Sequence, residues 1–371
     1  MKIFINVGDS SADVYAANLV KELKILKPKI EIFGNGGSLM QEAGVKLYYN
    51  LVDFGIIGFT EAAKSYFKLM RVLNKTVDFI IKNKIEAVIL IDYPGFNLIL
   101  AEKLKKHNIK VIYYVLPQVW AWGRGRIKKI KKFIDKAFVI FSFEKKIYEE
   151  ANIPVEFFGH PLVDIVKPSK TKQKLRHEFK LDKNKKIIGL FPGSRYQEIH
   201  SLLPLILKTV RNLKDVQFVL CQAVSIGDST IKKYLISSNL NIKVIKGRQY
   251  DIMSVCDCIL ASSGTVTLEA AIIGVPLVVI YKVSPFSFFL AKNLLKIPYI
   301  ALPNILAGSK IVPELFQDCA NEHKILKELS DLLYNKKIRE KMINDLKRIN
   351  IGLGKIGVSQ RMAKGMLKCL K

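Results

Sequence analysis

Short apolar runs rich in β-branched residues alternate along this chain with longer segments of helical spacing. This alternation constrains the fold more than any other feature, because near-continuous apolar strands are typical of parallel sheets covered on both faces by helices. The apolar runs are Ala87–Ile91, Val111–Val115, Ala137–Ile140, Ile187–Phe191, Val216–Leu220, Ile242–Ile245 and Pro276–Ile280. The clearest helical segments are Asp13–Leu26, Leu98–His107 and Leu202–Leu213. The pattern predicts an α/β doubly wound architecture.

The chain has 371 residues, more than one hydrophobic core usually serves, and its sequence suggests where it divides. Residues 167–174 are polar, charged and without periodicity, and they read as a linker. We therefore expect two Rossmann-like domains, at 1–165 and 166–350, with a cleft between them. Val358, Met362, Met366 and Leu370 have near-helical spacing. They predict a C-terminal helix within 351–371 that packs back on the N-terminal domain or on a partner subunit.

Lys and Arg outnumber Asp and Glu by 60 to 32, which gives a net charge of +28. The surplus favours an anionic partner, namely nucleic acid, a phosphorylated ligand or an anionic membrane surface, although a generally Lys-rich composition gives the same surplus. The basic residues are dispersed and no known nucleic-acid-binding signature is present, so we expect no nucleic-acid partner. A basic nucleic-acid-binding protein remains an alternative.

The five cysteines form no C-x-x-C pair, which argues against a disulfide scaffold and structural zinc. No cluster of acidic and histidine residues has metal-ligand spacing, and we expect neither a metal nor another cofactor. The N-terminus enters a strand directly and lacks the apolar run of a signal peptide. We therefore expect a cytoplasmic protein with no membrane-spanning helix.

Ligands of open α/β sheets bind beyond the carboxyl ends of the strands, so the loops that follow the strands are the candidate sites. The first such loop is Gly8–Asp13, where small residues and a helix start suit an anion or a polar ligand. Capping of the next helix by Ser11 or Asp13 is the alternative there, and it explains Asp9 less well. Asp92 follows another strand, and a carboxylate in partly apolar surroundings suits a general base. A helix-capping role is its alternative.

Two further segments of the first domain combine aromatic or apolar residues with basic ones. Both tryptophans, Trp120 and Trp122, precede a basic segment, which predicts an interfacial edge or a solvated charged helix. The segment 54–75 is apolar on one side and basic on the other, which predicts a membrane-facing patch or a helix that covers a core. The candidate patch residues are Ile56, Ile57, Phe59, Phe67 and Met70.

In the second domain, two strand-to-helix turns suit a diphosphate. Gly193, Ser194 and Arg195 end the first strand and combine a glycine, backbone N–H groups and a guanidinium, without the Lys of a Walker A motif. The residues 263–265 offer hydroxyls and N–H groups at a helix start. Glu269 is a lone carboxylate in an apolar stretch, and a ribose diol would partner it. For Gly193–Arg195 the alternative is an ordinary strand-to-helix turn with a surface arginine. For Glu269 it is a structural ion pair.

The segments around Asn304 and Gln317 are polar where a plain core would be apolar, and capping in plain loops is their alternative. Taken together, the motifs Gly8–Asp13, Asp92-Tyr93-Pro94, Trp120-Ala121-Trp122, Pro192-Gly193-Ser194-Arg195, Ser263–Glu269 and Leu302-Pro303-Asn304 resemble the lipid-A-disaccharide synthase family. The resemblance covers nearly the whole chain. It implies a two-Rossmann-domain (GT-B) fold and an inverting, metal-independent glycosyltransferase.

The resemblance implies that the enzyme joins UDP-2,3-diacylglucosamine to 2,3-diacylglucosamine 1-phosphate (lipid X), forming a β-1,6 linkage and releasing UDP. It also implies a homodimer that is peripherally associated with the cytoplasmic face of the inner membrane. On this reading Asp92 is the base and Arg195 offsets the charge of the leaving group. Substrate contacts are expected at Asp9, Ser11, Asn304 and Gln317. UDP contacts are expected at Gly193, Ser194, Arg195, Met253, Ser263, Gly264, Thr265 and Glu269.

Two departures from the family pattern fall in the first loop. The family usually has Glu where this chain has Asp9, and Gly where it has Ala12. Asp9 keeps the carboxylate with a shorter reach, and Ala12 tolerates positive φ less well than Gly. Another GT-B nucleotide-sugar enzyme, such as a UDP-GlcNAc 2-epimerase or a different transferase, is the alternative to the family's activity.

Overall fold

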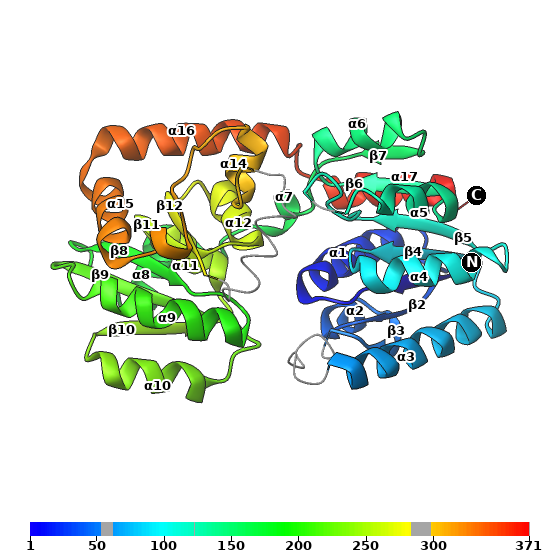
Figure 1. The fold of residues 1–371 in the computed structure, drawn as a ribbon, viewed down its shortest axis with the longest axis horizontal. Helices are drawn as coiled ribbons and strands as arrows, with labels where there is room; N and C mark the ends of the chain where they lie inside the picture. The colour runs from blue at the N-terminus through cyan, green and yellow to red at the C-terminus, as the bar shows by residue number, and fades with distance from the viewer. Residues whose placement is uncertain (53–61, 122, 283–297, 371) are drawn as a thin grey trace. The chain divides into compact units, whose positions relative to one another are not determined.

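The computed structural model describes residues 1–52, 62–121, 123–282 and 298–370 (Figure 1). The chain divides into two compact units. The first unit comprises Met1–Asp164 and Gly352–Lys371, and the second comprises Ile165–Ile351. Each unit has its own parallel sheet with helices, so the α/β class predicted from the alternation is confirmed.

The first unit contains a seven-stranded sheet in the order β3-β2-β1-β4-β5-β6-β7. The described strand pairs are all parallel. Its strands are β1 (Lys2–Asn6), β2 (Glu31–Gly36), β3 (Lys46–Asn50), β4 (Ala87–Ile91), β5 (Lys110–Tyr114), β6 (Lys136–Val139) and β7 (Val155–Phe157). All five residues of β4 are buried, which explains why its sequence is an unbroken apolar run.

The helices of the first unit cover both faces of this sheet. They are α1 (Ser10–Leu26), α2 (Ser38–Glu42), α3 (Ala62–Lys82), α4 (Pro94–Lys105), α5 (Arg126–Phe133), α6 (Ser142–Glu150), α7 (Leu162–Ile165) and α17 (Val358–Cys369). The predicted amphipathic segments are present. In α5, Ile130 and Phe133 are buried while Lys128, Lys129 and Lys132 are exposed.

The second unit contains a six-stranded sheet in the order β10-β9-β8-β11-β12-β13. Its strands are β8 (Lys186–Phe191), β9 (Val216–Gln222), β10 (Ile242–Lys246), β11 (Cys258–Ser262), β12 (Leu277–Tyr281) and β13 (Glu314–Phe316). Its helices are α8 (Lys172–Glu178), α9 (Tyr196–Val210), α10 (Asp228–Ser238), α11 (Gln249–Val255), α12 (Thr265–Ile273), α14 (Leu302–Ala307), η3 (Gln317–Cys319), α15 (Glu322–Tyr334) and α16 (Lys336–Gly352).

The C-terminal helix α17 packs against α1 within the first unit. The carboxylate of Asp164 fixes its start, accepting hydrogen bonds from Gly357 N and Ser359 N at 2.7 Å each. Gly365 lets the helix approach closely, since a Cβ there would lie 2.6 Å from the ring of Phe158. These contacts explain why a segment so distant in sequence joins the N-terminal fold.

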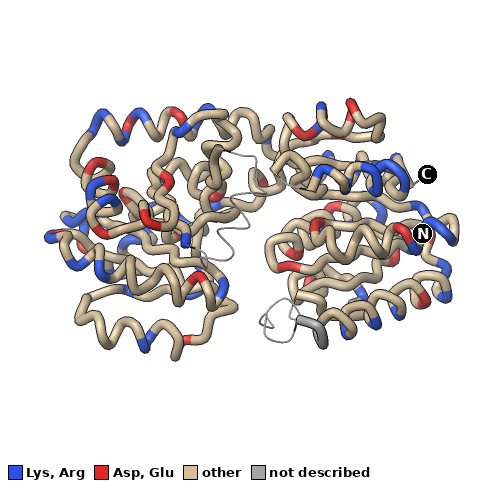
Figure 2. The backbone as a smooth tube through the Cα atoms, viewed as in Figure 1, with Lys and Arg blue, Asp and Glu red and all other residues tan. Residues whose placement is uncertain are grey.

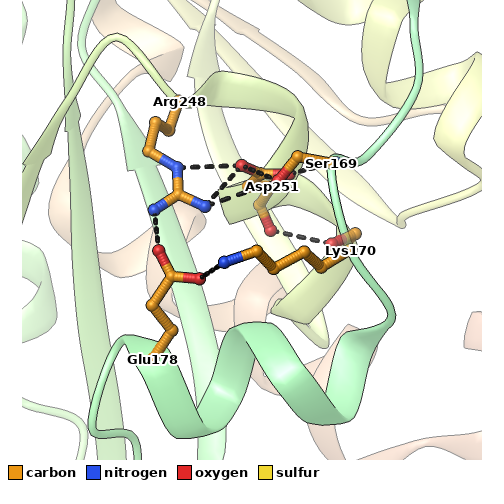
Figure 3. Close-up of polar contacts among 6 residues, drawn as sticks. Ser169, Lys170, Glu178, Arg248 and Asp251 are labelled. Atoms are coloured by element: carbon orange, nitrogen blue, oxygen red, sulfur yellow. Dashed lines mark hydrogen bonds and ion pairs between the residues drawn. The ribbon is translucent and has the colours of Figure 1, made fainter.

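The polar segment 167–174, expected as a linker, begins the second unit and is held there by hydrogen bonds and ion pairs, and its last residues start α8 (Figure 3). The Asp251 carboxylate accepts from Ser169 N at 2.6 Å and pairs with Arg248 at 2.8 Å. Lys170 and Arg248 both pair with Glu178, and they lower the pKa of that carboxyl to about 2. A helix of seven residues, α8, is too short for its periodicity to be recognised.

Candidate functional site

In each unit the strand order reverses at one point, and the candidate residues gather there. The reversal lies between β1 and β4 in the first sheet and between β8 and β11 in the second. Ligands of doubly wound folds bind beyond the strands at this point. Asp9 and Asp92 follow β1 and β4, and the turns starting at Pro192 and Ser263 follow β8 and β11.

Asp9 and Asp92 are neighbours in the first unit. Burial, the negative charge of Asp9 and a hydrogen bond between the two side chains raise the pKa of Asp92 to about 7. The backbone N–H of Tyr93 donates to Asp92 Oδ1 at 2.8 Å and opposes this rise. A carboxyl group with such a pKa exchanges protons readily near neutral pH, as general-base catalysis requires.

Asp9 is also the N-cap of α1, because its Oδ1 accepts a hydrogen bond from Ala12 N at 2.9 Å. The alternative that Ser11 or Asp13 caps this helix was wrong, and so was the argument that capping explains Asp9 less well. Ser11 lies in the first turn of α1, half-buried, and the Asp13 carboxylate caps α2 through Gly37 N at 2.8 Å and Leu39 N at 3.1 Å. Ala12 lies within the helix and does not have positive φ, so glycine is not required there.

A glycine brings the two acidic loops together. A Cβ at Gly8 would lie 2.2 Å from Tyr93 Cδ1, so the Tyr93 ring packs directly on the backbone of the first loop. Asp92 and Tyr93 have φ angles of 48° and 47°, both in the left-handed region. Consecutive non-glycine residues there are costly, and such backbone strain is concentrated at functional sites.

Two side chains near the same sheet edge, Glu144 and His160, were not identified from sequence. Glu144 is 1% exposed, and its carboxylate accepts from Trp120 Nε1 at 3.0 Å and from Phe141 N at 3.2 Å. Burial raises the pKa of Glu144 to about 7, and the charge of Asp92 adds to this rise. The glutamate three residues into a helix start is the signal that could have revealed it.

His160 follows β7 and is 2% exposed. Burial lowers the pKa of its imidazole to about 3, so the ring is neutral. Its Nδ1 accepts from Leu162 N at 3.2 Å, which assigns the proton to Nε2. The residues next to His160 in the sequence give no sign that its imidazole is buried.

In the second unit, Gly193 has a φ of 117°, and a Cβ there would lie 2.1 Å from Glu198 Oε2. Glu198 accepts from Ser194 N at 2.8 Å and pairs with the Arg195 guanidinium at 3.0 Å. The amide groups predicted for a diphosphate are therefore already occupied by a carboxylate. The Arg195 side chain is 78% exposed and has further donors available to a ligand.

The turn between β11 and α12 has the features expected of an anion site. Gly264, with φ of 153°, precedes the helix, and a Cβ there would meet nothing within 4 Å. Ser263 and Thr265 flank it and are half-buried. One turn further, burial raises the pKa of Glu269 to about 7, and a hydrogen bond with the Tyr250 hydroxyl limits the rise. Tyr250 was not identified from sequence.

Met253 and Asn304 lie in the interior of the second unit. Met253 is 0% exposed within the apolar core, so its side chain offers no surface to a nucleotide. Asn304 is also 0% exposed, and its Oδ1 accepts from Ile311 N at 2.7 Å and Val312 N at 2.9 Å. Its Nδ2 donates to Val312 O and to Glu314 Oε1. These four bonds use the whole amide inside the protein.

Glu314 extends this cluster to the start of α14, since its carboxylate accepts from Ile300 N and Ala301 N at 2.9 Å each. Ser263 Oγ donates to Ile300 O at 3.4 Å, so the cluster adjoins the candidate anion-binding turn. Gln317 follows β13 at the same edge of the sheet and has a φ of 50°. Asn304 and Glu314 therefore support the segment next to the candidate site.

The predicted membrane patch is described only in part. Phe67 on α3 is 71% exposed, while Met70, one turn later, is half-buried against the core. Ile56, Ile57 and Phe59, like Trp122 of the tryptophan loop, lie outside the described residues. Among the helices that the structure describes, none has the length and apolar character needed to span a bilayer.

Comparison with known proteins agrees with this arrangement. Residues 3–363 match the family model described as lipid-A-disaccharide synthetase. The lipid-A-disaccharide synthase of Geobacter sulfurreducens is 40% identical over 373 residues, covering 100% of this chain and 97% of the relative. That of Coxiella burnetii is 38% identical, covering 98% and 96%.

Among solved structures, the UDP-GlcNAc 2-epimerase of Neisseria meningitidis bound to UDP-GlcNAc has a TM-score of 0.64 and 16% identity, covering 99% of this chain and 100% of that one. A glycosyltransferase from Rickettsia africae has a TM-score of 0.59 and 13% identity, covering 100% and 98%. Similarity at this level of identity supports the GT-B fold alone.

Proposed function

This chain belongs to the lipid-A-disaccharide synthetase family, as its motifs predicted, and from this membership we propose how its residues carry out the reaction. It is a glycosyltransferase that joins UDP-2,3-diacylglucosamine to lipid X, giving the β-1,6-linked lipid A disaccharide phosphate and UDP. The observation that carries this assignment is the match to family members over nearly the full length of both chains. The distant epimerase neighbours share only the fold.

Asp92 is the general base of our proposal. Its carboxylate takes the proton of the acceptor 6′-hydroxyl as that oxygen attacks the anomeric carbon of the donor sugar. The bond between this carbon and the diphosphate oxygen breaks on the opposite side, which inverts the anomeric configuration and releases UDP. Support comes from the position of Asp92 at the strand-order reversal and from its pKa of about 7.

The second unit binds UDP in this proposal. Arg195, with Gly193, Ser194 and the start of α12 at 263–265, holds the diphosphate and offsets the charge that develops as it leaves. A diphosphate at the amide of Ser194 has to displace the Glu198 carboxylate that now accepts from it. Glu269 accepts from the ribose hydroxyls, because its buried carboxyl needs a polar partner.

Asp9, Ser11 and Gln317 contact the sugars in this proposal, since they lie at the carboxyl ends of β1 and β13. Asn304 and Met253 are assigned no direct contact, because both are fully buried. For Asn304 the supported role is to hold the segment beside Ser263 in place.

Both substrates carry acyl chains, and we propose that the enzyme docks on the cytoplasmic face of the inner membrane as a homodimer. The exposed Phe67 and the cationic residues on α3 and α5 support the docking, and the homodimer rests on the family resemblance alone. Each cationic residue near an anionic surface contributes about 1 kcal/mol. Figure 2 shows Lys and Arg on many elements of both units, so the positive charge is not gathered into one patch of the kind that binds nucleic acid.

The activity is tested by incubating the protein with UDP-2,3-diacylglucosamine and lipid X, followed by mass spectrometry. A tetra-acylated disaccharide phosphate is the expected product, and its absence would refute the assignment. Asp92→Asn should abolish turnover while calorimetry shows UDP binding intact, whereas Asp182→Asn, at an exposed loop of the second unit, should leave turnover unchanged. A near-normal rate in Asp92→Asn contradicts its role as base.

Membrane docking and metal independence are tested separately. Phe67→Ser should weaken binding to anionic vesicles, while Ile236→Ser, at a side chain 82% exposed on α10, should not. Equal binding of both variants would remove Phe67 from the membrane contact. EDTA should leave turnover unchanged, and a loss that divalent ions restore would establish a metal requirement. Light scattering of the purified protein should give the mass of a dimer.

A further inference from the structure

The backbone that carries Asp92 requires support from its surroundings. Tyr93 is a bulky residue with a φ of 47° directly after Asp92 with a φ of 48°. A non-glycine residue in this region is strained and persists only where neighbouring contacts hold it there. The turn is therefore destabilising in itself, and what it achieves is the orientation of the Asp92 side chain.

Asn97 supplies the contacts that hold this turn. It is 0% exposed on the first turns of α4, and its Nδ2 donates to Asp92 O at 2.6 Å and to Ile91 O at 3.2 Å. The hydroxyl of Tyr113 donates to the same Asp92 carbonyl at 2.6 Å. Burial raises the pKa of Tyr113 well above its usual value, so this hydroxyl remains a donor.

The orientation of the Asn97 amide is fixed by other buried amides beneath it. Its Oδ1 accepts from Asn6 Nδ2 at 2.7 Å, and Asn6 Oδ1 accepts from Asn35 Nδ2 at 2.8 Å. Asn35 also donates to Thr76 Oγ1 at 3.0 Å. Asn6 and Asn35 are register partners on β1 and β2, so the sheet itself sets their spacing. We call Thr76, Asn35, Asn6 and Asn97 the amide ladder.

Packing alone does not explain the amide ladder, because burying four polar side chains is less favourable than burying aliphatic ones. All four residues are 0% exposed, at positions where aliphatic side chains would fill the interior without polar groups to satisfy. Its directed bonds run from Thr76 to the Asp92 carbonyl, and a flip of the Asn97 amide would break three of them. A purely structural role gives no reason for the ladder to end at this turn.

We propose that Asn97 is a positioning residue for the transfer reaction, and that the amide ladder orients its amide so that it holds the Asp92–Tyr93 turn in the left-handed conformation. This inference rests on the proposed role of Asp92 as base. Without the two bonds from Asn97, the turn relaxes toward ordinary φ angles and the Asp92 carboxylate leaves its place beside Asp9.

The test compares Asn97→Ala with Thr209→Val, which removes a buried hydroxyl and its bond to Leu205 O on α9 of the second unit and leaves the amide ladder intact. Misplacing a reacting group by about 1 Å costs about a hundredfold in rate, so Asn97→Ala should lower kcat by about tenfold to a hundredfold with little change in KM. The acid limb of its pH profile should move to lower pH, because the displaced carboxylate gains water. Thr209→Val should retain the wild-type kcat and acid limb.

Three results overturn or separate the claims. If Asn97→Ala only lowers the unfolding midpoint, with kcat per folded molecule and the acid limb unchanged while Asp92→Asn is inactive, the positioning role is refuted and the base assignment stands. If Asp92→Asn itself remains active, the base assignment fails and the inference fails with it. If Asn97→Ala does not fold, Asn6→Ala replaces it. That variant removes the bond that orients Asn97, and an unchanged kcat there also refutes the proposal.

Discussion

The pairing of Asp9 with Asp92 makes a quantitative prediction about Asp9→Asn. The rise in the pKa of Asp92 from its ordinary 3.8 to about 7 corresponds to about 4 kcal/mol, since one pH unit is worth about 1.4 kcal/mol. Burial is the largest cause of this rise, and the charge of Asp9 is the next. Asp9 raises this pKa both by its charge and by a hydrogen bond, and we expect its charge to account for about 1–2 kcal/mol.

Replacing Asp9 by Asn removes the charge and keeps the helix cap, because Asn and Asp are equally good N-caps. The pKa of Asp92 should then fall by about one pH unit and remain well above 3.8, because burial persists. A base must be ionised to act, so activity rises with pH through this pKa. Lowering the pKa moves the acid limb of the profile to lower pH.

The assay is the pH dependence of kcat/KM between pH 5 and 9, measured by release of UDP. At pH 6 the ionised fraction of Asp92 should rise about fivefold in Asp9→Asn, from about a tenth to about a half. The phosphates of the substrates titrate in the same pH range, but the same substrates are used for every variant, so a difference between variants comes from the protein. Asp182→Asn is the matched control, since it removes one exposed aspartate of the second unit.

An acid limb that stays in place in Asp9→Asn would show that Asp9 does not set the pKa of Asp92. A limb that moves to higher pH would contradict the sign of the charge effect. A fall in kcat without a change in the limb would assign Asp9 to sugar binding alone.

Three further predictions concern stability. Gly8→Ala places a Cβ 2.2 Å from the Tyr93 ring and should lower the free energy of unfolding by about 1–3 kcal/mol in urea, whereas Gly95→Ala, with nothing within 4 Å, should not lower it. Asn304→Ala leaves several buried groups without partners and should cost about 2–4 kcal/mol, and loss of activity at unchanged stability would instead indicate a substrate contact. Burial favours the neutral form of the Glu144 carboxyl and raises its pKa. The stability that this neutral carboxyl contributes is therefore present below pH 4.5 and is lost as pH rises to about 7. Glu144→Gln should remove about 3 kcal/mol of this pH dependence of the free energy of unfolding, as measured by thermal unfolding.

The fold class was predictable because the hydrophobic pattern of consecutive residues indicates each strand and helix. The five residues of β4 are all buried, and their unbroken apolar run reports this directly. The turns at Gly193 and Gly264 were predictable for the same reason, since glycine after a strand marks a backbone with positive φ. The helix α8 was not predicted, because it is short and is held by ion pairs, which leave no periodic pattern.

The amino-acid sequence by itself determined the longer strands and helices and the loops that can carry chemistry, because hydrophobic period and turn chemistry are local properties of the chain. Only the tertiary structure decided which loops meet. Asn6 and Asn97 are 91 positions apart, yet their amides bond because β1 lies beside β4 in the sheet. The same strand order places Asp9 against Asp92. The amide of Asn304, on α14, is used entirely by hydrogen bonds within its own unit. Hydrogen-bond partners are set by adjacency in space, and one residue type can serve a ligand or the fold with no difference in its local sequence.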